Sequence, residues 1–296
     1  MPLRPVTELF TSAHTGGYAL GYFESWNLES LQGVIDAAEL TRSPIIIGFN
    51  GEFLTRPGRL SEERIGWYGT LGRAAAESAC VPCGLIFNEC PSDSAVKEAV
   101  KAGFNLVMLA DHEASFEDYL RRVSKLVQFA HKYRVAVEAE IGELPSGSTG
   151  EVNTSHSTLT DPELAARFVE ATNVDLLSVS AGNIHVLVND QQELDLDHLA
   201  EIRKKVHIPL GLHGGTGIEA DSLRAAIRLG VTKVNYGTYI KQCYLTVVRK
   251  ALDCTEINPH ILLGMGGSQD VIVAGRFAVR DAVLERIELL GCCGRA

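Results

Sequence analysis

Short apolar runs recur along the whole chain, each followed by a polar turn and an amphipathic helical segment, and this alternation leaves few folds open. Eight such runs favour a closed parallel (β/α)8 barrel, the TIM barrel, over a doubly wound open sheet. No G-x-G-x-x-G follows the first run, which weighs further against a dinucleotide-binding sheet. The predicted strands are Tyr18–Phe23, Ile45–Gly48, Gly84–Phe87, Leu106–Leu109, Val135–Glu140, Leu176–Ser180, Leu210–Leu212 and Lys233–Tyr236.

Helix candidates lie between these strands, and several begin or end as helices should. Asp161 places a capping carboxylate before Pro162 at the first helical position, and Gly103 and Gly230 stand where helices should stop. The predicted helices are Asn27–Leu40, Arg59–Ala79, Asp93–Ala102, Ser115–Tyr133, Asp161–Glu170, Asp195–Val206 and Glu219–Leu229.

The chain continues beyond the last predicted strand with two further helical segments, near Ile240–Leu252 and Asp270–Leu290. We therefore expect one barrel domain over 1–296, with 240–296 as a C-terminal helical extension. Such extensions commonly pack across a neighbouring subunit, so we expect a homodimer or homotetramer.

Composition excludes several classes of partner. The 296 residues are 46% hydrophobic and carry a net charge of -10 without a basic stripe, so neither nucleic acid nor an anionic membrane is expected to bind. Met1–Phe10 lacks the apolar segment of a signal peptide, and no stretch is long and apolar enough to span a membrane. Seven cysteines, an odd number, indicate free thiols, and we expect a cytoplasmic protein.

Polar residues follow most of the predicted strands. Because the carboxyl ends of barrel strands converge on one face, these residues can be considered as one site. They are Glu24, Asn50-Gly51, Asn88-Glu89-Cys90, Asp111-His112, Glu138, Glu140, Ser180, Asn183, His185, His213-Gly214-Gly215-Thr216 and Asn235-Tyr236-Gly237-Thr238.

Two imidazoles and one carboxylate of this set predict a divalent-metal site. His185, His213 and Glu89 come from three different strand ends and form a two-His-one-carboxylate set. The alternative is that Glu89 caps a helix or forms an ion pair.

Glycines and threonines after the last two strands indicate an anion cradle. Gly214, Gly215 and Thr216 precede a predicted helix, and Gly237 and Thr238 follow the eighth strand, where barrels often hold phosphate. The alternative for each loop is a tight turn. A long polar loop, Gly142–Thr160, is typical of a lid or of a disordered connection.

Several longer motifs occur together in one known family. G-G-Y-A at 16–19, N-L-E at 27–29, V-E-A-E-I-G at 137–142, L-H-G-G-T-G at 212–217 and K-V-N-Y-G-T at 233–238 cover nearly the whole chain. On these motifs the chain resembles the class II, metal-dependent ketose-bisphosphate aldolases of the fructose- and tagatose-bisphosphate type. The resemblance implies a small-molecule substrate and a divalent ion held by three histidines. Zinc is expected, with manganese or cobalt as alternatives.

The chain departs from the family at the predicted site. His185 and His213 match two of the three metal-binding histidines, whereas the family's Asp-His pair after strand three reads Asn88-Glu89. Further departures are Glu24 for Asn, Phe49 for a small polar residue, Ala110 for Asp, Val186 for Gly and Ser148 near the lid glutamate, with Glu151 the nearest carboxylate.

These departures change the expected chemistry. In the family the metal polarises a ketone, the lid carboxylate removes a proton and the Asp transfers a proton where the C–C bond breaks. The amide of Asn88 cannot exchange that proton, so cleavage of fructose or tagatose bisphosphate should be weak. Glu24 adds a negative charge, which makes a substrate with two phosphates less favourable and favours one with an amine or fewer charges. Asp111 or His112 is the hypothetical replacement proton carrier.

We predict a metal-dependent, aldolase-like lyase acting on a small hydroxy-carbonyl compound, phosphorylated or not. Two alternatives stay open: an epimerase or isomerase that forms an enolate without breaking a C–C bond, and a catalytically silent binding or scaffold homologue. Glu140 is expected close to the metal ligands Glu89, His185 and His213. The candidate catalytic residues are Asn88, Asp111, His112 and Glu151, and the candidate substrate-binding residues are Glu24, Gly214, Gly215, Thr216, Asn235, Tyr236, Gly237 and Thr238.

Overall fold

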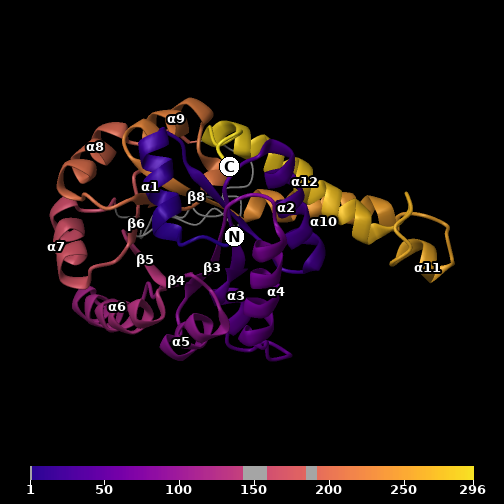
Figure 1. The fold of residues 1–296 in the computed structure, drawn as a ribbon, viewed down its shortest axis with the longest axis horizontal. Coiled ribbons are helices and arrows are strands. Elements are labelled where there is room, and N and C mark those ends of the chain that lie inside the picture. Colours follow the sequence, from indigo (N-terminus) through magenta and orange to yellow (C-terminus); the bar gives the residue numbers. More distant parts are fainter. Residues whose placement is uncertain (1, 143–158, 185–191) are drawn as a thin grey trace.

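The computed structural model describes residues 2–142, 159–184 and 192–296. Its eight strands are parallel and pair in sequence order, and β8 pairs with β1, so the sheet closes into the predicted TIM barrel (Figure 1). The strands are β1 (Leu20–Glu24), β2 (Ile45–Asn50), β3 (Cys83–Cys90), β4 (Leu106–Leu109), β5 (Ala136–Ile141), β6 (Leu176–Val179), β7 (Leu210–Leu212) and β8 (Val231–Tyr236). The prediction of eight strands is confirmed.

Helices surround the barrel (Figure 1), and those predicted between strands are all present. They are α1 (Val6–Gly16), α2 (Leu28–Thr41), α3 (Gly51–Thr55), α4 (Ile65–Ser78), α5 (Asp93–Ala102), α6 (Phe116–Ala130), α7 (Pro162–Thr172), α8 (Leu196–Lys205), α9 (Ala220–Arg228), α10 (Thr238–Leu252), α11 (Pro259–Leu262) and α12 (Val271–Leu290). No helix in the described part of the chain combines the length and apolarity that a membrane span needs.

One helix boundary was predicted wrongly. The predicted helix Arg59–Ala79 begins only at Ile65, and the short helix α3 precedes the intervening loop. The Arg59 side chain explains the loop, because it donates to the carbonyl oxygens of Phe53 and Ser61 and pairs with Glu63. These bonds hold the segment in a non-helical conformation.

Helix α1 lies against the amino-terminal ends of the barrel strands, and the sequence analysis missed it. Val6, Phe10 and Ala13 are buried at helical spacing, and Val6 lies where a side chain on Gly84 of β3 would stand. The helix therefore covers the end of the barrel opposite to the polar strand ends.

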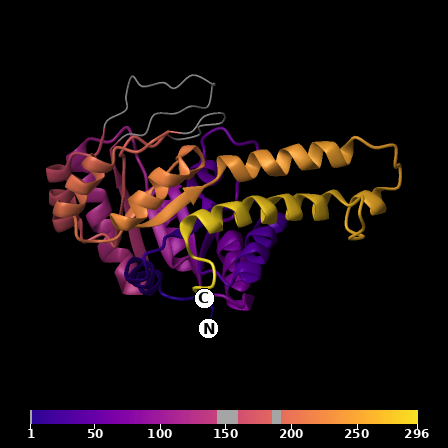
Figure 2. The ribbon, with the colours of Figure 1, turned by 90° about the horizontal axis from the view of Figure 1, so that it is seen from above.

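The C-terminal extension is a helical hairpin that projects sideways from the barrel (Figure 2). Helix α12 packs along α2 and α10, and its contacts depend on glycines, because a Cβ on Gly33 would lie 2.5 Å from the carbonyl oxygen of Arg276. Toward the far end of the hairpin Ile257 and Met265 are 93% and 68% exposed. The homodimer or homotetramer stays a prediction.

We predict that Gly33→Ala destabilises the protein, because the added methyl group overpacks the α2–α12 contact. The free energy of unfolding should fall by about 1–3 kcal/mol in chemical denaturation. Gly66→Ala is the matched control, since a Cβ there meets no atom within 4 Å and Ala favours the helix. Equal stability of the two variants would contradict this account of the packing.

Candidate active site

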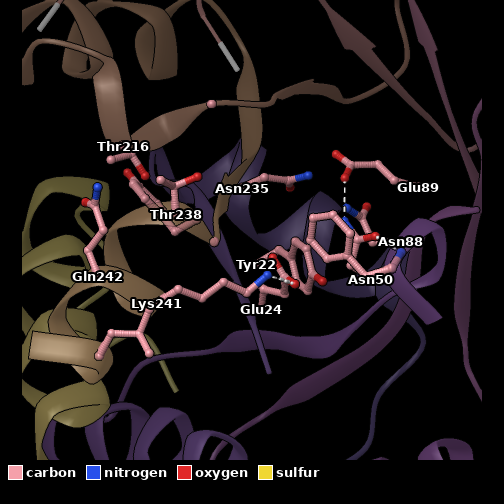
Figure 3. A pocket seen from close by; sticks show the side chains of 15 residues that line it. Tyr22, Glu24, Asn50, Asn88, Glu89, Thr216, Asn235, Thr238, Lys241 and Gln242 are labelled. Atoms are coloured by element: carbon pink, nitrogen blue, oxygen red, sulfur yellow. Dashed lines mark hydrogen bonds and ion pairs between the residues drawn. The ribbon is translucent and has the colours of Figure 1, made fainter. Parts of the chain in front are cut away.

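A cavity of about 260 Å³ opens at the carboxyl ends of the strands (Figure 3). We call it the active-site cavity. Most of the sequence-predicted residues line it, and the structure adds residues from β1, α3 and α10. The lining is Tyr22, Glu24, Asn50, Phe53, Asn88, Glu89, Gly214, Thr216, Asn235, Tyr236, Gly237, Thr238, Lys241, Gln242 and Leu245.

The backbone of β3 turns two adjacent side chains into this cavity. Asn88 and Glu89 both line it, which a regular strand does not allow because successive side chains point to opposite faces. Glu89 has φ of 49°, and the register with β4 shifts between Phe87 and Cys90. This local irregularity aims the Glu89 carboxylate inward.

Glu89 meets His213 inside the barrel. Glu89 Oε1 lies 2.9 Å from His213 Nδ1, and Asn50 Nδ2 donates to Glu89 Oε2 at 2.7 Å. Glu140 Oε1 lies 3.4 Å from the same ring nitrogen. Two of the three predicted metal ligands are therefore in contact, and Glu140 is beside them as expected. The third, His185, lies outside the described residues.

A fully buried ion pair fixes the orientation of the His213 ring. Glu138 Oε1 lies 3.1 Å from His213 Nε2, and Lys233 Nζ lies 2.8 Å from Glu138 Oε2. Ser178 Oγ also donates to Glu138, at 2.7 Å. Burial opposes ionisation of Glu138, but the charge of Lys233 and the contact with His213 lower its pKa to about 2. The ring nitrogen opposite Glu138 is thereby directed toward Glu89.

The charges around His213 favour a cation. Glu89, Glu138 and Glu140 surround the His213 ring and Lys233 pairs with Glu138, so carboxylates outnumber the cationic side chains around the ring. Burial alone would lower the pKa of His213, but the three carboxylates raise it to about 10. A divalent ion beside Nδ1 would suit the remaining negative charge and these ligand types. Among the described residues, no three His, Cys, Asp or Glu side chains form a complete metal site.

Four residues that line the active-site cavity carry a buried polar atom without a hydrogen-bond partner among the described residues. The atoms are the hydroxyls of Tyr22 and Tyr236, Oδ1 of Asn88 and Nδ2 of Asn235. Burial, with the nearby Glu24, raises the pKa of Tyr22 well above 10, so its hydroxyl stays protonated at neutral pH. Together these atoms offer donors and an acceptor to a polar ligand.

Tyr22, Lys241 and Gln242 are cavity residues that the sequence analysis missed. Tyr22 stands two positions before Glu24 on one strand, so the two share a face. Lys241 and Gln242 stand three and four positions after Thr238, which is the spacing of one helix face. Both signals were present in the sequence.

Glu24 is paired, which corrects part of the expected substrate chemistry. Lys241 Nζ donates to Glu24 Oε1 at 2.5 Å. The prediction of an amine-bearing substrate assumed that the Glu24 charge was uncompensated, and this ion pair removes that reason.

Of the residues predicted to form the anion cradle, some line the cavity and one is packed against the barrel. Gly214, Thr216, Gly237 and Thr238 line the cavity, and Gly214 has φ of 68°, which favours glycine. Gly215 is outside the lining, and a Cβ there would lie 2.6 Å from Val234. Its position is explained by close packing.

Tyr236 borders the active-site cavity, but its ring belongs to the core. The ring stacks on Phe23 with centroids 5.3 Å apart, and the residue is 1% exposed. This arrangement explains Tyr236 by packing, and it gives no support to the predicted contact of its ring with substrate.

Asp111 and His112 line a neighbouring cavity on the same face, together with Glu140. The Asp111 carboxylate pairs with Arg122, which also bonds Asp93. Partial burial opposes ionisation of Asp111, but the bond from Arg122 lowers its pKa. This pairing gives no support to Asp111 as a proton carrier, and His112 is exposed. Glu151 and most of the predicted lid, 143–158, lie outside the described residues.

We predict that Lys233→Met strongly destabilises the protein, because it leaves the Glu138 charge buried and uncompensated. The loss should be about 3–5 kcal/mol in chemical denaturation at neutral pH. Lys205→Met is the control, because its partner Glu163 is a surface residue and solvent screens the pair. A Lys233→Met variant as stable as the control would show that the buried pair is not needed.

Comparison with known proteins identifies one family over nearly the whole chain. The family model described as class II fructose-bisphosphate aldolase matches residues 4–295. The uncharacterised protein YdjI of Escherichia coli K12 is 33% identical over 279 residues, or 94% of each chain. The crystal structure of the YdjI aldolase from that organism has a TM-score of 0.82 at 30% identity, with 99% of both chains covered. A fructose-bisphosphate aldolase structure from Campylobacter jejuni shares the fold, with a TM-score of 0.77 at 21% identity over 98% of this chain and 95% of that one. The chain therefore belongs to the class II fructose-bisphosphate aldolase family.

Proposed function

We propose that the protein is a metal-dependent aldolase-type lyase that makes or breaks a C–C bond in a small hydroxy-carbonyl compound. Family membership supports the lyase class. The observation that carries the proposal is the 2.9 Å contact between Glu89 Oε1 and His213 Nδ1 at the wall of a polar cavity. Two ligand types brought from β3 and β7 to one point suit a cation.

Glu89 and His213 would hold the metal, with Glu140 close by and His185 as the third predicted ligand. Glu138 and Lys233 act as positioning residues, because they fix the His213 ring. When bound, the ion supplies Lewis-acid stabilisation of negative charge on a substrate carbonyl oxygen. Zinc is the ion expected from the family, and manganese or cobalt would use the same ligands.

The other cavity residues would bind and orient the substrate. The Tyr22 hydroxyl and Asn235 Nδ2 donate to substrate oxygens, and Asn88 Oδ1 accepts from a substrate hydroxyl. Thr216 and Thr238 with the adjoining glycines bind an anionic group of the donor. Since the amide of Asn88 moves no proton at neutral pH, fructose and tagatose bisphosphate should be poor substrates.

We predict that Glu89→Ala and His213→Ala abolish binding of zinc, manganese or cobalt, because each removes a ligand. Glu138→Gln should keep the site but weaken metal affinity by about 10–100-fold, because it loosens the His213 ring. Glu163→Gln, on the surface, should bind as the wild type does. Metal content by mass spectrometry and competition with a fluorescent chelator would measure this. Unchanged affinity in Glu89→Ala would remove the proposed site.

We predict that the metal-loaded protein exchanges the α-proton of dihydroxyacetone or its monophosphate with solvent deuterium, and then adds an aldehyde. NMR would detect both steps, and a chelator should stop them. Exchange without C–C bond formation across a panel of aldehydes would favour an epimerase or isomerase. If the protein neither exchanges the proton nor binds metal, the result would favour a binding or scaffold homologue.

A further inference from the structure

The active-site cavity adjoins a second chamber of about 210 Å³. The two spaces share Glu24, Asn50, Phe53 and Lys241 as lining residues, so these residues form their common wall. Beyond this wall the second chamber is lined by Ser25, Trp26, Phe49, Leu54, Arg59, Glu63 and Tyr68. Figure 3 shows the Lys241 side chain beside the Glu24 carboxylate, and both residues also line the second chamber. A ligand bound at Glu89 and extended past this ion pair would enter the second chamber.

The cations that line the two spaces, among the described residues, are Lys241 and Arg59, and both are occupied. Lys241 bonds Glu24 at 2.5 Å and lies 4.3 Å above the Phe53 ring. The Arg59 guanidinium donates to the Phe53 and Ser61 carbonyl oxygens at 2.7 and 3.3 Å and pairs with Glu63. The carboxylates of Glu24 and Glu63 already balance these two positive charges, so an anionic group would add uncompensated negative charge to the chamber. The chamber is therefore poorly suited to a phosphate.

The second chamber is suited to an uncharged, hydroxylated chain. Ser25, which lines the chamber, is 1% exposed, and its buried Oγ hydrogen-bonds to no described residue. Trp26 and Tyr68 add aromatic surface, on which the C–H groups of a sugar-like chain can pack. The Glu24–Lys241 pair offers an acceptor and donors at the entrance. A polyol could supply the hydrogen bond that the buried Ser25 hydroxyl lacks and could pack against the aromatic rings.

We propose that the second chamber binds the far end of the aldehyde component as an uncharged polyol, so that the substrate is longer than the active-site cavity alone holds and carries no terminal phosphate there. This inference rests on the proposed aldolase function for the position of the bond that is made or broken. Ser25 and the Glu24–Lys241 pair are its specificity-determining residues.

Kinetics with one donor, dihydroxyacetone or its monophosphate, and aldehydes of increasing length would test this with the metal-loaded protein. We expect kcat/KM to rise roughly tenfold or more from glycolaldehyde to pentoses, and to fall when the far hydroxyl is phosphorylated. Ser25→Ala should raise KM roughly three- to tenfold for pentoses but leave glycolaldehyde unchanged. Ser43→Ala, at a buried serine before β2 on the opposite end of the barrel, is the matched control.

Charge provides a second test. Glu24→Gln removes the carboxylate paired with Lys241, so it should narrow or reverse the discrimination against a terminal phosphate. A wild type that prefers the phosphorylated aldehyde, or a Ser25→Ala variant that affects short and long aldehydes equally, would overturn the proposal.

Binding of unreactive polyols separates this inference from the proposed activity. Saturation-transfer NMR should show ribitol binding more tightly than glycerol to the wild type and to Ser43→Ala, and this preference should disappear in Ser25→Val, which replaces the hydroxyl by apolar bulk. If no aldehyde reacts but this pattern holds, the lyase assignment fails and the polyol chamber stands. If aldehydes react but ribitol shows no preference over glycerol, the chamber assignment fails alone.

Discussion

Lys233, Glu138 and His213 form a chain of buried polar groups inside the barrel, and the geometry of the site depends on it. The three residues come from β8, β5 and β7, and none of their side chains is exposed. Each buried charge would be costly alone, because it has lost its hydration. Lys233 compensates the charge of Glu138, and Glu138 in turn contacts His213. These contacts also fix the orientation of the imidazole ring.

The position of Glu89 depends on a second, local constraint. A glutamate with φ of 49° is strained, since the left-handed region favours glycine or asparagine. Contacts of the Glu89 carboxylate with Asn50 and His213 stabilise this unfavourable backbone conformation. Because of it, two neighbouring residues of one strand, Asn88 and Glu89, both face the cavity, where a regular strand would present only one.

The barrel could be predicted from the sequence because buried parallel strands are nearly continuous apolar runs. The five-residue helix α3 has too few residues for a periodic signal, and the loop around Arg59 is held by side-chain bonds that no local pattern reveals. For the site, convergence of the strand ends was enough to bring Glu89 and His213 together. Lys233 lies in one of the sequence motifs, but its buried partner Glu138 is far away in the sequence. The ion pair between them could therefore be recognised only in the folded structure.

Helix α10 belongs both to the site and to the projecting hairpin. Thr238, Lys241, Gln242 and Leu245 line the active-site cavity from one face of this helix, and the same helix runs on into the hairpin of Figure 2. A rigid helix moves as a unit, so a shift of the hairpin about its base would reach the ion pair at the cavity wall. Substitutions along the hairpin can therefore change the shape of the cavity without any change at Glu89 or His213.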